Sequence, residues 1–200
     1  MESPYKNSPV DKWESITSEL IKKHPLKVDN IVEAVLESWK DIFATKIADR
    51  YLIGSDIFPK PQIMGFFLHE LIPLRLAEME PQKWRVDSEK KDKDVVCVEN
   101  EDYSIEIKTS SNKDQVFGNR SYGKKRDACC SKKEKSKSGY YLLVNFEKFS
   151  SKVKKPKIRM IRFGWIDQDD WRSQSAETGQ QSRLDSDVYK GKMQIIYQAN

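Results

Sequence analysis

The stretch that decides the fold is Asp94-Val95-Val96-Cys97-Val98, followed after a short polar break by Tyr103-Ser104-Ile105-Glu106-Ile107-Lys108. Both runs are rich in β-branched residues, and the polar residues between them predict two β-strands joined by a turn. Successive strand residues point to opposite faces, so Glu106 and Lys108 share one face and the isoleucines on either side of Glu106 share the other. An antiparallel turn centred on the polar break places Asp94 opposite Glu106.

The polar side chains of this hairpin suit a metal site. Directly paired residues on antiparallel strands have Cβ atoms roughly 5 Å apart, so the carboxylates of Asp94 and Glu106 can hold one cation. Mg²⁺ prefers oxygen ligands and usually takes one or two carboxylates, leaving its other positions to water and phosphate. Lys108 would then lie beside an attacking water and offset the negative charge that develops on the phosphorane. The hairpin therefore predicts Mg²⁺-dependent phosphodiester hydrolysis.

The same pattern has a second interpretation without catalysis. Charged residues make up 34% of the chain, so an Asp followed by a Glu-x-Lys at this separation arises often by chance. On this interpretation the residues form a solvated sheet face with a cross-strand ion pair. Asp92 also competes with Asp94 for the metal role, and we favour Asp94 because it directly precedes the apolar strand. The apolar interior of both strands and the basic segment that follows favour the metal site.

Basic residues are concentrated in one part of the chain. Residues 108–159 contain 16 lysines and arginines and four acidic residues, whereas the whole chain has a net charge of +5. A basic segment beside an acidic remainder is typical of nucleic-acid binding, because neutralised phosphates supply most of the non-specific affinity. For residues 132–137 a solvated lysine-rich loop is an equally good interpretation.

The composition excludes several other classes. No apolar run is long enough to span a membrane and no basic-then-apolar signal opens the chain, so we expect a cytoplasmic protein without a membrane partner. The three cysteines, two of them adjacent, predict neither a disulfide framework nor a zinc site, and we expect them to be reduced. Two histidines are too few for a His-metal nuclease motif.

Hydrophobic periodicity places the elements along the chain. Amphipathic patterns predict helices at 11–24, 29–47 and 62–80, with a loop over 52–61. After the hairpin we expect strands at 140–146, 157–166 and 193–197. We also expect a short helix near 122–130, another beginning within 167–172, and a polar loop over 178–184.

The chain thus has a helical first part and a strand-rich second part. This order predicts an α+β fold or a three-layer α/β/α core. We divide it into an N-terminal helical region, residues 1–86, and a core with nucleic-acid-binding loops, residues 87–200, within one domain. His69 is assigned to the surface of the third helix and not to a ligand set.

Beyond the hairpin, the chain carries a series of short blocks. They are Phe58-Pro59-Lys60-Pro61-Gln62-Ile63-Met64, Thr109-Ser110-Ser111, Phe117-Gly118-Asn119-Arg120-Ser121-Tyr122-Gly123, Ser138-Gly139-Tyr140-Tyr141, Arg162-Phe163-Gly164-Trp165 and Thr178-Gly179-Gln180-Gln181. In this order, and together with the hairpin, they resemble the ScaI-like type II restriction endonucleases of the PD-(D/E)XK nuclease superfamily. One departure is Lys93, which stands where the superfamily signature has a proline that contributes backbone shape and not a ligand.

The resemblance implies a fold and a chemistry. The fold is an α/β (α+β) PD-(D/E)XK restriction-endonuclease-like core, a central mixed sheet flanked by helices, with the N-terminal helical region attached. Catalysis falls to Asp94, Glu106 and Lys108, with Mg²⁺ held by Asp94, Glu106 and Ile107. The reaction is cleavage of both strands of double-stranded DNA at a short palindrome, leaving 5′-phosphate and 3′-hydroxyl ends.

The resemblance also implies partners. A palindrome is two-fold symmetric, so a C₂ homodimer with one active site per strand is the economical architecture. The N-terminal helices are the candidate interface, with Trp13 and Trp39 as anchors, although packing of both within the monomer is the competing interpretation. A cognate DNA methyltransferase is expected in the same system.

Further site residues are candidates from loops and helices. Two polar loops offer side chains that read base edges, bind phosphate or hold the loop together. These interpretations stay open except for Lys124 and Lys125, which are assigned to phosphate contacts. These candidates are Ser110, Asn119, Arg120, Ser121, Tyr122, Lys124, Lys125, Gln180, Gln181 and Arg183. Glu70 and Glu37 are candidate auxiliary carboxylates, for which a solvated helix face is the competing interpretation.

Two other functions fit the same residues. One is a DNA repair or recombination nuclease of the same fold, which would read DNA structure instead of sequence. The other is a non-catalytic DNA-binding domain in which the carboxylate pair has no chemical role.

Overall fold

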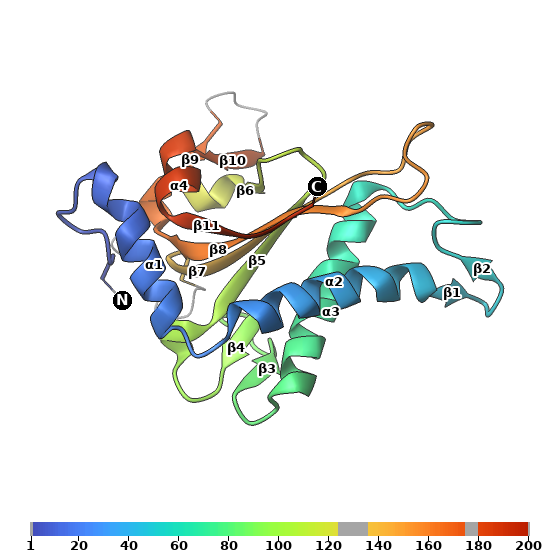
Figure 1. Cartoon of the computed structure of the whole chain (residues 1–200), viewed down its shortest axis with the longest axis horizontal. Helices are drawn as coiled ribbons and strands as arrows, with labels where there is room; N and C mark the ends of the chain where they lie inside the picture. Colours follow the sequence, from blue (N-terminus) through green and yellow to red (C-terminus); the bar gives the residue numbers. More distant parts are fainter. Residues whose placement is uncertain (1, 124–135, 175–179, 200) are drawn as a thin grey trace.

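A six-stranded mixed β-sheet forms the centre of the protein (Figure 1). The computed structural model describes residues 2–123, 136–174 and 180–199. Across the sheet the strands follow the order β11 (Met193–Gln198), β8 (Ile158–Ile166), β7 (Gly139–Phe146), β5 (Ile105–Ser110), β4 (Val95–Cys97) and β3 (Trp84–Val86). Strands β5 and β7 are parallel, whereas the other neighbours are antiparallel.

Three helices from the first part of the chain pack against one face of this sheet. They are α1 (Trp13–Lys23), which follows the 3₁₀ turn η1 (Val10–Lys12), α2 (Val28–Ala44) and α3 (Pro61–Met79). Met64, Leu68, Ile72 and Leu76 recur every four residues and form the buried stripe of α3. The three predicted helices are confirmed to within three residues at each end.

The end of α2 differs from the prediction. The helix stops at Ala44, and β1 (Lys46–Ile47) then pairs with β2 (Tyr51–Leu52) in a small antiparallel hairpin. Ala48 and Asp49, the central residues of its turn, both have φ near +55°. The apolar Ile47 therefore belongs to this hairpin and not to the stripe of α2.

A second layer covers the opposite face of the central sheet. It contains a three-stranded sheet in the order β6 (Phe117–Asn119), β10 (Gln181–Leu184) and β9 (Trp171–Ser173), together with α4 (Ser186–Gly191). The 3₁₀ turns η3 (Arg120–Gly123) and η4 (Gln168–Asp170) connect these strands to the rest of the chain. Because both faces are covered, every residue of β7 is buried, which explains its continuous apolar run.

This second layer corrects three sequence predictions. The polar loop expected over 178–184 contains strand β10, and the helix expected from 167–172 is only the turn η4, followed at once by β9. The short helix expected near 122–130 begins as η3, while residues 124–130 lie outside the described residues. The strands of this layer pair with partners up to about 60 residues away, so their local sequence carries little strand signal.

The predicted hairpin is confirmed, with its register. Strand β4 is antiparallel to β5, and Val95 pairs with Ile105 across a turn that includes η2 (Glu101–Tyr103). One step further along this register, Asp94 faces Glu106. The central mixed sheet flanked by helices is the fold class that the sequence predicted. No helix in the described ranges combines the length and apolar character that crossing a membrane requires.

Candidate active site

A notch between β4 and β5 brings the predicted catalytic residues together. Strand β4 begins at Val95, whereas β5 continues to Ser110 along β7, so the chain before β4 leaves the edge of β5. In this notch the amide of Ile107 donates a hydrogen bond of 2.6 Å to Oδ2 of Asp94. The side chain of Asp94 remains 19% exposed, so its carboxylate is oriented by the backbone and still reachable from solvent.

Glu106 and Lys108 form the other half of the notch. The Lys108 ammonium lies 2.6 Å from Oε1 of Glu106 and donates a second hydrogen bond, of 3.1 Å, to the carbonyl oxygen of Ile107. The side chain of Glu106 is only 5% exposed. A carboxylate buried to this extent requires a cation or hydrogen bonds to offset its lost hydration, and Lys108 supplies both.

Tyr122 reaches this site from the second layer. Its hydroxyl donates a hydrogen bond of 2.7 Å to Oε1 of Glu106, and the Lys108 ammonium lies 4.9 Å from the centre of its ring. The ring itself packs edge-on against Trp171, with centroids 5.2 Å apart. Tyr122 was predicted to belong to the DNA-binding loop, and the structure places its hydroxyl on a predicted metal ligand.

His69 approaches from the opposite layer. Its Nδ1 lies 3.6 Å from Oδ2 of Asp94. One turn earlier in α3, a Cβ atom on Gly65 would lie 2.7 Å from Oγ1 of Thr109, so the glycine allows α3 to lie close against β5. His69 thus lies on the surface of α3, as predicted, but the sequence did not predict its contact with Asp94, because no local pattern relates the two residues.

The competing acid, Asp92, is held by other contacts. Its Oδ2 accepts hydrogen bonds from Nη1 of Arg85 at 2.8 Å and from the amides of Ser88 and Glu89. The Arg85 hydrogen bond is the main cause that lowers the pKa of the Asp92 carboxyl to about 2. Asp92 thus organises the loop before β4, and Asp94 remains the carboxylate in the notch.

Lys93, at the position where the superfamily has proline, also has a structural role. Its ammonium donates to the carbonyl oxygen of Ser138 at 3.0 Å and lies 5.4 Å from the centre of the Tyr141 ring. The side chain passes so close to Gly139 that a Cβ there would lie 2.0 Å from Nζ. Lys93 therefore ties the chain next to Asp94 to the start of β7.

The two predicted DNA-binding loops form one surface. Gln181 pairs with Asn119, and Arg183 pairs with Phe117, in the antiparallel ladder between β10 and β6. The side chains of Asn119, Gln181 and Arg183 are exposed on the same face, and the amide of Arg120 donates to the carbonyl of Gln180. Segments about 60 residues apart in sequence thus meet beside the notch, connected to it through Tyr122.

The remaining candidates are placed as follows. Ser110 ends β5, and its Oγ accepts a hydrogen bond from the amide of Asn112. Ser121 is exposed, and its carbonyl accepts a hydrogen bond from Lys137. Lys124 and Lys125 lie outside the described residues.

The two candidate auxiliary carboxylates are both on helices. Glu37 is ion-paired with Lys40 on α2, and Glu70 is exposed on α3. Among the residues that the structure describes, no three His, Cys, Asp or Glu side chains form a metal-binding group. The notch thus offers two carboxylates and a main-chain carbonyl, a set that suits Mg²⁺ better than a metal requiring a full protein cage.

A central mixed sheet flanked by helices, with Asp94, Glu106 and Lys108 in one notch, agrees with the restriction-endonuclease-like fold that the sequence predicted. Comparison with known proteins agrees. Residues 3–197 match the model of the ScaI restriction endonuclease family. The chain is also 45% identical over 197 residues to the type II restriction enzyme ScaI of Streptomyces caespitosus, covering 98% of this chain and 85% of that enzyme.

The chain therefore belongs to the ScaI restriction endonuclease family and is a type II restriction endonuclease, a site-specific deoxyribonuclease. Among solved structures, the tetrameric restriction endonuclease SfiI bound to cognate DNA gives a TM-score of 0.45 at 11% sequence identity, covering 100% of this chain and 89% of that one.

Proposed function

We propose that this restriction endonuclease hydrolyses both strands of double-stranded DNA at a short palindromic site in a Mg²⁺-dependent reaction that leaves 5′-phosphate ends. The observation that carries the proposal is the convergence of Asp94, Glu106 and Lys108 at one notch. Asp94 is oriented by the Ile107 amide, and Lys108 contacts Glu106. A solvated sheet face would not require a buried glutamate with both a lysine and a tyrosine hydroxyl on one oxygen.

The residues of the notch fit a divalent ion. The Lys108 ammonium already contacts both the Glu106 carboxylate and the Ile107 carbonyl, so these oxygens face a place that accepts positive charge. Mg²⁺ would be held by Asp94, Glu106 and the carbonyl of Ile107. When bound, it supplies Lewis-acid polarisation of the scissile phosphate and makes a bound water more acidic.

Each side chain of the notch has its own role in the reaction. Lys108 holds the attacking water by a hydrogen bond and stabilises the negative charge that develops on the phosphorane. The water gives up a proton to solvent as its oxygen bonds to phosphorus while the bond from phosphorus to O3′ breaks. The phosphate therefore stays on the 5′ end, and O3′ takes up a proton from solvent. The Ile107 amide holds Asp94 and Tyr122 holds Glu106, which keeps both carboxylates oriented throughout.

The exposed face of β6 and β10 is the proposed base-reading surface. Asn119, Gln181 and Arg183 carry the amide and guanidinium groups that recognise adenine and guanine in the major groove. Gln180 and Arg120, joined by a main-chain hydrogen bond, lie at its edge. We assign phosphate contacts, which set the position on the duplex, to Ser110, Ser121, Lys124 and Lys125.

The recognition of a palindrome favours a homodimer. Trp39 is a poor anchor for it, because the side chain is buried and its indole N–H donates to the carbonyl of Pro156. Trp13 packs against Gly191 and Lys192 of its own chain. Within the helical region 1–86, the exposed apolar side chains of α3, Ile63, Phe66 and Leu74, are the better-supported interface.

The proposal extends to the cellular setting. The enzyme would act in the cytoplasm, where its DNA substrate lies. A cognate DNA methyltransferase would protect the host copies of the same site.

Digestion of a plasmid of known sequence, followed by sequencing of the ends, tests the proposal. We expect discrete fragments with Mg²⁺, none with EDTA, and 5′-phosphates at a single palindromic site. Asp94→Asn should abolish cutting. Asp92→Asn is the matched control, since it removes a neighbouring carboxylate that lies outside the notch, and the folded variant should keep its activity per molecule.

Two results would overturn the proposal. Cutting only at branches, ends or mismatches would favour a repair or recombination nuclease of the same fold. Sequence-independent DNA binding without any cutting by the wild-type protein, in Mg²⁺ or another divalent ion, would favour a DNA-binding domain.

A further inference from the structure

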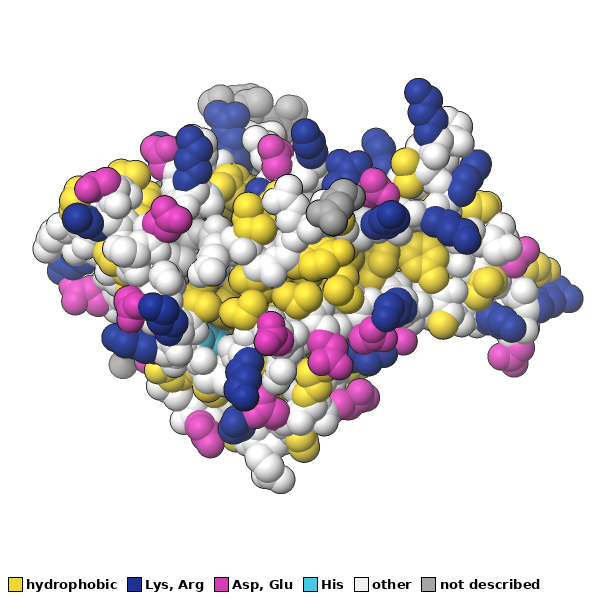
Figure 2. Space-filling view, viewed as in Figure 1, with side chains coloured by type: hydrophobic (Ala, Val, Ile, Leu, Met, Phe, Trp, Pro, Cys, Tyr) yellow, Lys and Arg dark blue, Asp and Glu magenta, His cyan; other side chains and the backbone are white. Residues whose placement is uncertain are grey.

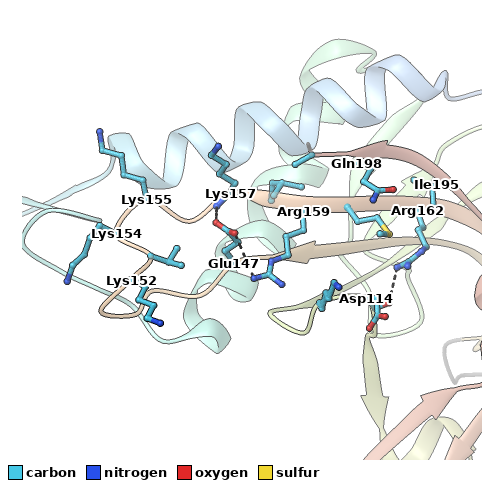
Figure 3. Close-up of a pocket in the computed structure, with 15 residues that line it drawn as sticks. Asp114, Glu147, Lys152, Lys154, Lys155, Lys157, Arg159, Arg162, Ile195 and Gln198 are labelled. Carbon is cyan, nitrogen blue, oxygen red and sulfur yellow. Dashed lines mark hydrogen bonds and ion pairs between the residues drawn. The ribbon is translucent and has the colours of Figure 1, made fainter.

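A basic groove lies beyond the end of β5, the strand that carries Glu106 and Lys108. Strands β5 and β7 run parallel, and Ser110 pairs with Asn145 where both strands end. The loops that follow them, residues 111–116 and 147–157, therefore leave the sheet together. Ser110 is only two residues beyond Lys108, roughly 7 Å along the strand. These two loops, together with β8 and β11, line a groove of about 890 Å³ (Figure 3).

The lining of this groove is strongly positive. Seven of its residues are basic and two are acidic. The basic residues are Lys113, Lys152, Lys154, Lys155, Lys157, Arg159 and Arg162. Of the two acids, Glu147 is already engaged, because its carboxylate lies 3.8 Å from Nη2 of Arg159 and accepts a hydrogen bond from the amide of Lys157.

Buried side chains hold one wall of the groove in place. The Asn145 side chain is fully buried and donates to the carbonyls of Asn112 and Gln115, at 3.1 and 3.0 Å. Arg162, 6% exposed, donates to the carbonyl of Asp114 at 3.0 Å and to Oδ1 of Asn145 at 3.1 Å. The loop that carries Lys113 is therefore fixed before any ligand arrives.

The opposite wall presents lysines to solvent. Residues 147–157 form the loop between β7 and β8, which projects from the body of the molecule, and Figure 2 shows Lys and Arg side chains gathered over this region. Lys152, Lys154 and Lys155 are exposed. In the described part of the chain none of these three ammonium groups forms an ion pair, so their charge is available to a ligand.

We propose that this groove binds the phosphodiester backbone of duplex DNA outside the recognised bases. The inference rests on the proposed function for the identity of the polyanion, and it adds a contact surface that is separate from the face of β6 and β10. Ammonium groups on a projecting loop can follow a phosphate backbone without reading sequence, and each neutralised phosphate releases condensed counterions. Ser110 connects the strand that carries Glu106 and Lys108 to the loop that carries Lys113, so a duplex bound at the notch can extend towards the groove.

The test measures binding without catalysis. Affinity of the full-length protein for a fluorescent duplex of arbitrary sequence is determined by anisotropy, in EDTA, over a series of salt concentrations. The variant K152Q/K154Q/K155Q removes the lysines of the projecting loop. The control K12Q/K23Q/K27Q removes three exposed lysines in and around α1, so it has the same net charge as the groove variant.

The two triple variants should behave differently. Each lost phosphate contact lowers the slope of log K against log salt by about 0.9, so the groove variant should lose between 2 and 3 in slope and roughly tenfold or more in affinity at low salt. The control should match the wild type. In Mg²⁺, the groove variant should show a lower kcat/KM on plasmid DNA, while kcat at saturating DNA stays within about twofold.

If log K fell with log salt at the same slope in both variants, or in the groove variant and the wild type, the proposal would be overturned. The loop 147–157 would then be a solvated loop without a role in DNA binding. A specific loss of slope in a protein that never cuts DNA would support the groove and sink the nuclease proposal, so the two failures are distinguishable. Should the triple variant unfold, the single variants Lys152→Gln and Lys155→Gln must each lower the slope by about 1, and unchanged slopes would count against the groove.

Discussion

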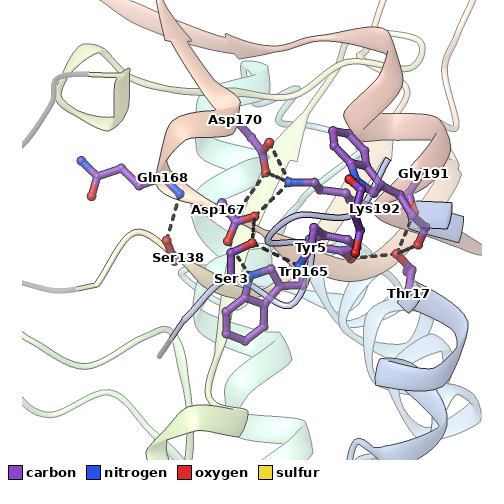
Figure 4. Close-up of polar contacts among 12 residues, drawn as sticks. Ser3, Tyr5, Thr17, Ser138, Trp165, Asp167, Gln168, Asp170, Gly191 and Lys192 are labelled. Atoms are coloured by element: carbon purple, nitrogen blue, oxygen red, sulfur yellow. Dashed lines mark hydrogen bonds and ion pairs between the residues drawn. The ribbon is translucent and has the colours of Figure 1, made fainter. Parts of the chain in front are cut away.

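Two clusters in this molecule contain the same three charged groups, two carboxylates and one lysine, yet they have different consequences. One is the notch of Asp94, Glu106 and Lys108. The other joins Asp167 and Asp170, around η4, to Lys192 at the end of α4 (Figure 4). Both lie at the ends of elements, and all six side chains are at least four-fifths buried.

In the second cluster every charge is enclosed. The Lys192 ammonium lies 2.9 Å from Asp167 and 2.8 Å from both oxygens of Asp170. The rings of Tyr5 and Trp13 cover it, each with its centre 4.4 Å away. Asp167 also accepts hydrogen bonds from Ser3 and from the Trp165 indole, so the cluster fastens the N-terminal segment to the sheet.

In the notch the contacts are arranged differently. Lys108 pairs with one carboxylate and shares its remaining contacts between a carbonyl and an aromatic ring. Asp94, just before the neighbouring strand β4, is oriented by a main-chain amide instead of by the lysine. Residue type is thus a poor guide to role. In the structural cluster one lysine neutralises both acids. In the notch the lysine contacts only one acid, which leaves the site able to accept a metal and a phosphate.

The largest expected effect comes from removing the lysine of the notch. Lys108→Ala should lower the rate of Mg²⁺-dependent DNA cleavage by roughly 10³-fold, because the developing charge on the phosphate loses its cation. Single-turnover cleavage at saturating DNA measures this loss, and DNA binding measured in EDTA should change by less than about threefold. Cleavage at the wild-type rate would show that the notch, like the cluster around Lys192, has no catalytic role.

Removing the lysine of the other cluster should act on stability. Lys192→Ala leaves two buried carboxylates without their cation, and breaking such a pair costs about 3–5 kcal/mol of unfolding free energy. Urea denaturation measures the change, with Lys190→Ala, an exposed lysine on the same helix, as the control within about 0.5 kcal/mol. The folded Lys192 variant should retain its cleavage rate per molecule, and a selective loss of kcat would contradict the structural role.

A buried histidine makes the stability of the whole protein, and hence of both clusters, depend on pH. His24 lies among Trp84, Tyr103, Tyr140 and Phe163. Its Nδ1 accepts from the Leu26 amide, and its Nε2 therefore donates to the Tyr103 carbonyl, so the neutral ring is fully bonded. Burial is the main cause that lowers its pKa to about 4.

Because the unfolded chain binds this proton at a higher pH, stability should be complete above pH 6.5 and decline as the pH falls towards 4, by about 3 kcal/mol in total. Urea denaturation at intervals of half a pH unit follows the decline. His24→Gln should flatten it over this window, whatever its stability at neutral pH. An equally steep decline in the variant would assign the effect to other groups.

The smallest expected effect tests how Glu106 is held. Tyr122→Phe removes one hydrogen bond to its Oε1 and should lower kcat about fivefold, corresponding to about 1 kcal/mol, with a shift in the Mg²⁺ concentration needed for half-maximal rate. Tyr189→Phe is the matched control, since its hydroxyl bonds the main chain of Val116 away from the notch. Equal effects of the two substitutions on kcat would remove Tyr122 from the site.

Local sequence predicted the features that depend on neighbouring residues. The hairpin and its register follow from β-branched runs around a polar turn, and the helices from their apolar stripes. The strands β9 and β10 were missed because they are short and polar, and only their mutual pairing makes them strands. His69 was missed because its approach to Asp94 depends on how closely α3 packs at Gly65.

Composition and pattern were therefore enough to predict a basic, nucleic-acid-binding α/β protein with an Asp and a Glu-x-Lys on a β-hairpin. The alternation of side chains along a strand and the apolar period of a helix both depend on residues close together in sequence. Tertiary packing decided which of two acids, Asp92 or Asp94, lies in the notch. It also decided that Tyr122 contacts Glu106 and that Asn119 lies beside Gln181. These are contacts between segments far apart in sequence, and their geometry exists only once both faces of the sheet are covered.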